Sequence, residues 1–213
     1  MPTVKQFAIS SSQNGCSTAG LRELNNQIVE RLLNAVNTED ETNLVSCSDI
    51  PLLHVVGNST IPLLQPAARK SLEQVIELKN RRLNLIHAYR TIAQQFVLRE
   101  WRLAGRCHIT AARKPGTSDH ERGIAIDIDD SDFWKSTLQQ HGWAWAGPGD
   151  RGHFSYTGIG INPEVITESV RAFQGLWNRN NPNDLIDEDG IFGDIQTGPR
   201  LLLSPIEGFP IVV

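Results

Sequence analysis

The sequence predicts an α+β fold, in which a small antiparallel sheet is flanked by helices and followed by a small helical module. Three observations predict it. Apolar residues recur at helical spacing early in the chain, and strands interleaved with helices come next. After Asn162 the sequence has the pattern of a helix followed by a turn-rich loop. We therefore expect a helical segment over residues 1–60, a main domain over 61–160 and a module over 161–213.

Four longer segments and two short ones have the apolar spacing or the end signals of helices. Their ranges are 19–36, 65–80, 90–105, 131–142, 163–181 and 197–205. Ser17 or Thr18 can cap the first helix, and Pro66 suits the first turn of the second. Ser131 and Gly142 are the expected caps of the fourth. The polar stretch NTEDETN, residues 37–43, is typical of a loop.

Three segments are typical of strands: RLNLIHAY (82–89), GIAIDI (123–128) and HFSYTG (153–158). Alternation places Leu83, Leu85, His87 and Tyr89 on one face of the first strand, which makes His87 a candidate core histidine. In the second strand the isoleucines share the core face. Ala125 and Asp127 therefore face the other way, and the small Ala125 leaves room beside the carboxylate.

Composition excludes several classes of protein. The chain has 213 residues, 39% hydrophobic and 21% charged, which is ordinary for a soluble globular protein. The net charge of −4 without a basic tail argues against nucleic acid as a partner. No stretch reaches the ~20 apolar residues of a membrane span, and the N-terminus lacks the apolar core of a secretion signal. We expect a monomer.

The three cysteines, Cys16, Cys47 and Cys107, cannot all be paired with one another because their number is odd. Cys16 and Cys47 could bond across one helical segment, although connectivity does not follow from sequence. The absence of a CxxC pair excludes a thiolate zinc finger. Cys107 beside His108 leaves open a thiol nucleophile with its base, but adjacent residues in an extended chain point apart.

Two histidines and an aspartate can form a metal site. His120 precedes the second strand in a turn that contains Gly123, so His120 and Asp127 can converge on one point. His153 begins the last strand and can supply the third ligand, as catalytic zinc requires. Asp150, three residues earlier, can accept a proton from an attacking water. Taken alone, a His and an Asp at this spacing would more often be a strand after a solvated turn. His54, His87, His108 and His141 have ordinary structural explanations.

Three motifs resemble one peptidase family. Ser118, His120, Gly123, Ala125 and Asp127 reproduce S-x-H-x-x-G-x-A-x-D, which resembles the zinc motif of the D-alanyl-D-alanine carboxypeptidase family of metallopeptidases. The segment DRGHF is similar to the family's second motif, although Asp150 stands where many members have Glu. The segment HAYRTIAQQ is similar to the SxYRS…Q segment, whose arginine supports the substrate carbonyl or the transition state.

This resemblance covers residues 61–160 and implies a function. Zn²⁺ would be held by His120, Asp127 and His153, with Asp150 and Arg90 as catalytic residues. Arg90, Ser118 and Tyr89 would lie at the substrate. The substrate would be a peptidoglycan stem peptide, cut at D-Ala–D-Ala or at L-Ala–D-Glu, and DRGHF favours the endopeptidase branch. The protein would act at the cell wall, outside the cell or in the periplasm, delivered by lysis or an injection system.

The tail resembles a second family. The pieces F-Q, D-G-x-F-G and T-x-x-R-L are similar to the small helical peptidoglycan-binding module, whose first helix is reduced or missing here. The tail could instead brace the main domain. Two rival functions stay open for the whole chain: a catalytically inactive, zinc-containing wall-binding protein, and a thiol hydrolase built on Cys107.

Overall fold

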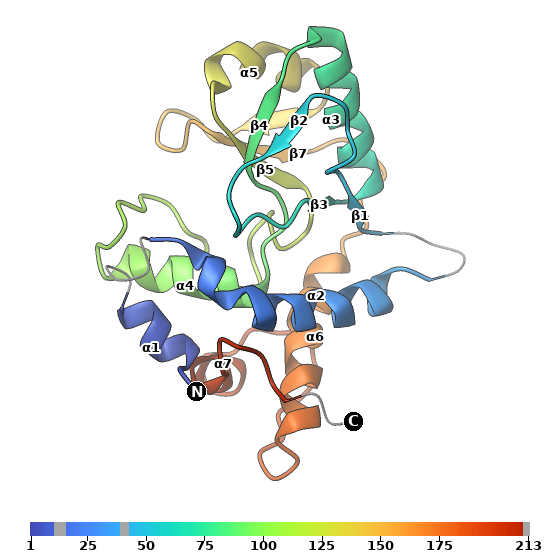
Figure 1. The fold of residues 1–213 in the computed structure, drawn as a ribbon. Coiled ribbons are helices and arrows are strands. Elements are labelled where there is room, and N and C mark those ends of the chain that lie inside the picture. Colours follow the sequence, from blue (N-terminus) through green and yellow to red (C-terminus); the bar gives the residue numbers. More distant parts are fainter. Residues whose placement is uncertain (11–15, 39–42, 211–213) are drawn as a thin grey trace. The chain divides into compact units, whose positions relative to one another are not determined.

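The structure, a computed structural model, describes residues 1–10, 16–38 and 43–210 (Figure 1). Its helices are α1 (Val4–Ile9), the 3-10 helix η1 (Thr18–Leu21), α2 (Arg22–Val36), α3 (Pro66–Lys79), α4 (Ile92–Leu103), α5 (Ser131–Gln140), α6 (Val165–Asn180) and α7 (Thr197–Leu203). Its strands are β1 (Val45–Ser46), β2 (Leu53–Val55), β3 (Leu63–Leu64), β4 (Leu83–His87), β5 (Ala125–Ile128), β6 (Trp143–Trp145) and β7 (His153–Tyr156). The predicted α+β class is confirmed.

By its internal contacts the chain divides into two units, each built from separate stretches of sequence. The helical unit comprises residues 1–36, 91–118 and 166–213. The sheet unit comprises residues 37–90 and 119–165. The boundaries expected near residues 60 and 160 remain a prediction. Part of the expected loop over 37–43 lies outside the described residues.

The sheet unit contains a five-stranded sheet, as far as the structure describes the chain, in the order β2-β4-β5-β7-β6. Strand β2 runs parallel to β4, and the other neighbours are antiparallel. β1 and β3 form a separate antiparallel pair. In Figure 1, α3 and α5 lie beside the five-stranded sheet. Strands β1, β2, β3 and β6 were not expected from the sequence; each is only two or three residues long.

One face of the sheet is the core of this unit. Ile126 and Ile128 of β5 and Phe154 of β7 are buried there, as alternation predicts. Both covering helices supply large apolar side chains to the same cluster, among them Leu72, Val75 and Ile76 from α3 and Trp134 and Leu138 from α5. Burial of each such side chain contributes about 1.5–3 kcal/mol, so this face fixes how the strands pair.

Local sequence signals mark the residues at which the helices begin, and only some of these starts were predicted correctly. Pro66 lies in the first turn of α3, as expected. Helix α4 starts at Ile92, where Thr91 and Gln94 form a capping box, and not at Arg90. Ser131 is the first residue of α5 rather than its cap; the cap position is taken by Asp130, in a left-handed conformation.

The helical unit is built on the apolar face of α2. Leu24, Ile28 and Leu32 are completely buried there, as the helical spacing predicts. Helix α1, which sequence reading missed, contacts α4 and α7. The indole Nε1 of Trp101 in α4 donates to the carbonyl oxygen of Ala8 at 2.9 Å. None of the described helices combines the length and the apolar character that a membrane crossing requires.

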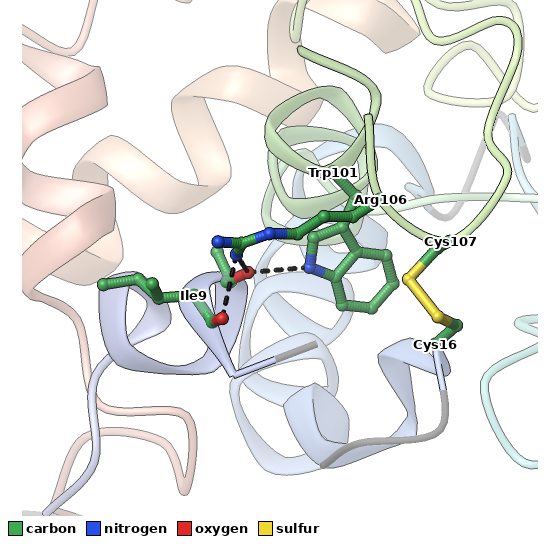
Figure 2. Close-up of a disulfide and its surroundings, with 6 residues drawn as sticks. Ile9, Cys16, Trp101, Arg106 and Cys107 are labelled. Atoms are coloured by element: carbon green, nitrogen blue, oxygen red, sulfur yellow. Dashed lines mark hydrogen bonds between the residues drawn. A yellow bond between two sulfur atoms is a disulfide. The ribbon is translucent and has the colours of Figure 1, made fainter. Parts of the chain in front are cut away.

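A disulfide joins Cys16 and Cys107 within the helical unit (Figure 2). The pairing of Cys16 with Cys47 considered from the sequence is therefore wrong. Cys47 is buried in the core of the sheet unit, where its thiol donates to the carbonyl oxygen of Pro62 at 3.3 Å. Because the sulfur of Cys107 is bonded, the thiol hydrolase reading also loses its nucleophile.

In the C-terminal stretch, the three motif pieces meet at Gln174 of α6. Its Nε2 donates to Asp189 Oδ1 at 2.8 Å and lies 3.2 Å from the hydroxyl of Thr197. Its Oε1 accepts from the amide of Gly190 at 2.8 Å. The F-Q, D-G and T pieces of the sequence thus form one connected structure. Its binding role remains a prediction.

Candidate metal centre

Strands β5 and β7 bring together two of the three predicted metal ligands. The strands are antiparallel, and Asp127 is paired directly with His153. The next pair, Ile126 and Phe154, lies in the core cluster. Because side chains alternate along a strand, Asp127 and His153 project from the opposite face of the sheet, next to each other.

His120 reaches the same place from the turn before β5. The amide of Gly123 donates to the carbonyl oxygen of His120 at 3.1 Å and closes that turn. Gly123 has a φ of +68°, and a Cβ there would lie 2.4 Å from Cδ2 of Leu44. Both the backbone conformation and the lack of space therefore require glycine at this position of the motif.

The three side chains converge. His120 Nε2 lies 3.3 Å and His153 Nδ1 lies 3.0 Å from Asp127 Oδ1. The two nitrogens are 3.1 Å apart. His120 is almost completely buried, whereas His153 and Asp127 keep 16% and 18% of their side chains exposed, so the cluster can be reached from solvent on their side. These atoms could hold a metal ion.

The state of His120 suits a metal ligand. Its Nδ1 lies 2.6 Å from the carbonyl oxygen of Ala88, an acceptor only, so Nδ1 carries the hydrogen and Nε2 presents a lone pair to the cluster. Burial, followed by the charge of Arg90, lowers the pKa of His120 to about 4, and Asp127 opposes this shift. The imidazole is therefore neutral near pH 7, as metal ligation requires.

The second carboxylate oxygen of Asp127 is held by two other side chains. Arg90 donates from Nη2 to Oδ2, and His87 Nδ1 lies 3.0 Å from the same oxygen. Burial alone would raise the pKa of Asp127, but the neighbouring histidines and the permanent charge of Arg90 hold it well below its usual range. Asp127 is thus ionised, and its Oδ1 is left to face the cluster.

The position of His87 corrects an expectation. Alternation placed it in the core with Leu83 and Leu85, yet it lies at the candidate centre with 27% of its side chain exposed. The pairing of β4 with β5 shifts register between Leu85 and His87. Such an irregularity reverses the face on which the following side chains lie, so a rule of strict alternation fails there.

Two further polar residues at the cluster were missed. Ser155 Oγ lies 3.1 Å from His153 Nε2 and donates to Asp119 Oδ2 at 2.9 Å. Ser155 follows His153 by two residues on the same strand face, and Asp119 directly precedes His120. A polar residue two positions from a ligand in a strand was the signal that could have found Ser155.

Asp150 lies in the turn that leads into β7. Its amide donates to Gly147 O at 3.2 Å, and its carbonyl oxygen accepts from the amide of His153 at 3.1 Å. The carboxyl is partly buried, which raises its pKa, and the charge of Asp127 raises it further against opposing effects of His153 and Arg90. These interactions place Asp150 within the electrostatic reach of the cluster.

The remaining predicted site residues lie in the interior. Tyr89 is 1% exposed and Ser118 is 4% exposed. Arg90 has 13% of its side chain exposed, and its Nε is buried without a hydrogen-bond partner among the described residues.

His141 caps α5 through its contact with Thr137 O at 2.8 Å, as expected for a histidine at a helix end. His54 contacts Asn84 at 3.1 Å.

Two imidazole nitrogens and one carboxylate oxygen form the donor set of many catalytic metal sites, and the neutral, pre-oriented His120 fits that use. Residues 63–146 match the model of a protein family described as VanY, D-alanyl-D-alanine carboxypeptidase. This match agrees with the resemblance that the motifs predicted for the main part of the chain. The matched stretch includes Arg90, His120 and Asp127 and ends before Asp150 and His153. No curated protein matches the chain.

Proposed function

We propose that the protein is a zinc peptidase that hydrolyses peptide bonds in the stem peptides of peptidoglycan. The observation that carries the proposal is the convergence of His120, Asp127 and His153, whose ligand atoms lie within 4.8 Å of one another. The family match over residues 63–146 supports the same conclusion. A zinc ion held by these three side chains would lower the pKa of a water molecule and polarise the scissile carbonyl.

In this proposal Asp150 is the general base. It would take a proton from the attacking water and pass one to the leaving amine. A carboxyl in this role benefits from a raised pKa, because a group that titrates nearer the working pH both accepts and returns a proton. Burial and the charge of Asp127 both raise the pKa of Asp150. Asp150 is also joined to His153 through the turn, which fixes its distance from the ligand set.

Arg90 has two proposed roles. Its contact with Asp127 Oδ2 keeps that carboxylate ionised and oriented. Its charge would also offset the negative charge that develops on the carbonyl oxygen in the transition state. Tyr89 and Ser118, assigned to the substrate by resemblance, are buried; we propose that they act as supports of Arg90 and of the His120 turn.

The substrate class rests on the family, and the scissile bond is the open choice within it. The family description favours removal of a terminal D-Ala, whereas the DRGHF segment resembles L-Ala–D-Glu endopeptidases.

We infer that the protein acts in the periplasm or outside the cell. The Cys16–Cys107 disulfide supports this location, because such bonds persist in oxidising compartments. We also propose that the Gln174-centred C-terminal structure binds peptidoglycan.

The test is digestion of purified cell-wall sacculi by the full chain, with mass spectrometry of the products. Free D-Ala would identify a carboxypeptidase, and new amino-terminal D-Glu would identify an endopeptidase. A chelator should abolish cleavage and added Zn²⁺ should restore it. Asp150→Asn should lower the rate by about 10²- to 10⁴-fold, while Asp49→Asn, at a carboxylate that is 68% exposed, should not change it.

Three results would contradict parts of this proposal. Cleavage that survives exhaustive chelation would exclude a metal-dependent peptidase. Full activity in Asp150→Asn would remove the base assignment and leave the metal site intact. Stoichiometric zinc binding without any new termini on any wall type would favour the catalytically inactive wall-binding protein.

A further inference from the structure

We propose that Asp119 and Ser155 act as positioning residues, which fix the protonated nitrogen of His153 and thereby set the affinity of the centre for its metal ion. The inference rests on the proposed metal site. It concerns two residues outside the candidate ligand set, which contact the cluster through His153. The chain of contacts runs from Asp119 Oδ2 to Ser155 Oγ and on to His153 Nε2.

The number of available hydrogens decides the direction of these bonds. A serine hydroxyl has one hydrogen, and Ser155 donates it to Asp119 Oδ2 at 2.9 Å. The contact of Ser155 Oγ with His153 Nε2 at 3.1 Å must then use an oxygen lone pair, so Nε2 carries the hydrogen. An imidazole that binds a metal ion is neutral and has a single N–H, so Nδ1 of His153 is the nitrogen left to bind the ion.

The lone pair of that nitrogen faces two others. His153 Nδ1 lies 3.0 Å from Asp127 Oδ1 and 3.1 Å from His120 Nε2. His120 Nε2 carries no hydrogen, because the hydrogen of that imidazole is on its Nδ1 and is donated to the carbonyl oxygen of Ala88. Three acceptors with no hydrogen between them repel one another unless a cation lies among them. The outer hydrogen bonds thus hold the ligands in the arrangement that a metal ion stabilises best.

Without the hydroxyl of Ser155, the tautomer of His153 can change. The hydrogen of His153 could move to Nδ1, where it would bond to Asp127 Oδ1, and this bond would compete with the metal. Ser155 is paired across the sheet with Ala125, the alanine of the motif, whose small side chain lies next to it on the same face. A larger side chain at position 125 would fill the face on which Ser155 meets Asp119.

The first measurement is the zinc affinity of the metal-free full chain, by competition with a chromophoric chelator. We expect Ser155→Ala and Asp119→Ala each to bind zinc about 10- to 100-fold more weakly. The double variant should bind no more weakly than Ser155→Ala, because Asp119 acts through Ser155. Ser155→Thr keeps the hydroxyl and should stay near the original affinity. Ser136→Ala, on the exposed side of α5, is the matched control.

The second measurement needs no metal. Nitrogen-15 NMR of the histidine side chains reports which ring nitrogen is protonated. His153 should be the Nε2–H tautomer in the unmodified protein and should shift towards Nδ1–H in Ser155→Ala. A side chain that only fills space would not move this signal. If Ser155→Ala does not fold, Asp119→Ala provides the same comparison.

The outcomes distinguish an error in the proposed metal site from an error in the roles of Asp119 and Ser155. If the unmodified protein binds no zinc, the proposed metal site is wrong and this inference is wrong with it. If it binds zinc and both single variants bind equally well with an unchanged His153 tautomer, only the inference is wrong. Strictly additive losses in the double variant would also overturn it, because they would mean that Asp119 and Ser155 act independently.

Discussion

Replacement of both bonded cysteines by serine, Cys16→Ser with Cys107→Ser, should lower the free energy of unfolding substantially. The bond spans 91 residues of sequence. Closing a loop of that length removes entropy from the unfolded chain, and the chain-entropy relation gives about 4.6 kcal/mol at 25 °C. The bond therefore ranks above any single hydrogen bond in the helical unit, each of which contributes about 0.5–1.5 kcal/mol.

The native state should tolerate this change, because other contacts join α1 to the end of α4 and to the residue before Cys107 (Figure 2). Arg106 Nη1 donates to the carbonyl oxygens of Ala8 and Ile9 at 3.0 and 2.8 Å, and Trp101 Nε1 also donates to Ala8. These bonds remain when the sulfur atoms are removed. The loss should therefore come from the unfolded state and should approach the calculated value.

Urea unfolding followed by circular dichroism, with and without reductant, measures the effect. Reductant should destabilise the unmodified protein by about the same 4–5 kcal/mol and should not affect the double variant. Cys47→Ala serves as the control, because it removes the free thiol and leaves the bond. A difference below about 1 kcal/mol would refute the reasoning, since the chain-entropy relation would then fail for this loop.

Two further predictions concern the candidate centre. In the metal-free protein, stability should fall as the pH drops from 6.5 to about 4, because unfolded His120 binds a proton that the buried side chain does not. The loss should reach about 3 kcal/mol; urea unfolding against pH measures it, and an equal slope in His120→Gln would contradict it. Gly123→Ala should cost about 1–3 kcal/mol in thermal unfolding, because its Cβ would meet Leu44, whereas Gly149→Ala, with open space around it, should cost little.

The convergence of His120, Asp127 and His153 could be predicted from sequence because the motif and the alternation rule agree. Isoleucines at 124, 126 and 128 define a core face, and Asp127 must then face the other way. His153 alternates in the same manner with Phe154, which is completely buried. Local pattern sufficed here because both strands are regular where they pair.

The same rule failed for His87, and the reason is physical. An irregularity in the β4–β5 pairing is decided by contacts between strands, which the sequence of one strand does not display. Cysteine connectivity failed for a similar reason, since the bond between Cys16 and Cys107 depends on tertiary placement. Helix α1 was a different case: Thr3 and Gln6 form a capping box, so its start signal was present in the sequence.

The accuracy of the candidate centre depends on packing on the far side of the sheet. Asp127 opposes His153 only because Ile126 opposes Phe154 one position away. A slip of one residue would turn Asp127 into the apolar cluster and expose Ile126 to solvent. The apolar face therefore selects the one register in which these two candidate ligands meet. Substitutions that loosen this core should reduce metal affinity even though they touch no ligand.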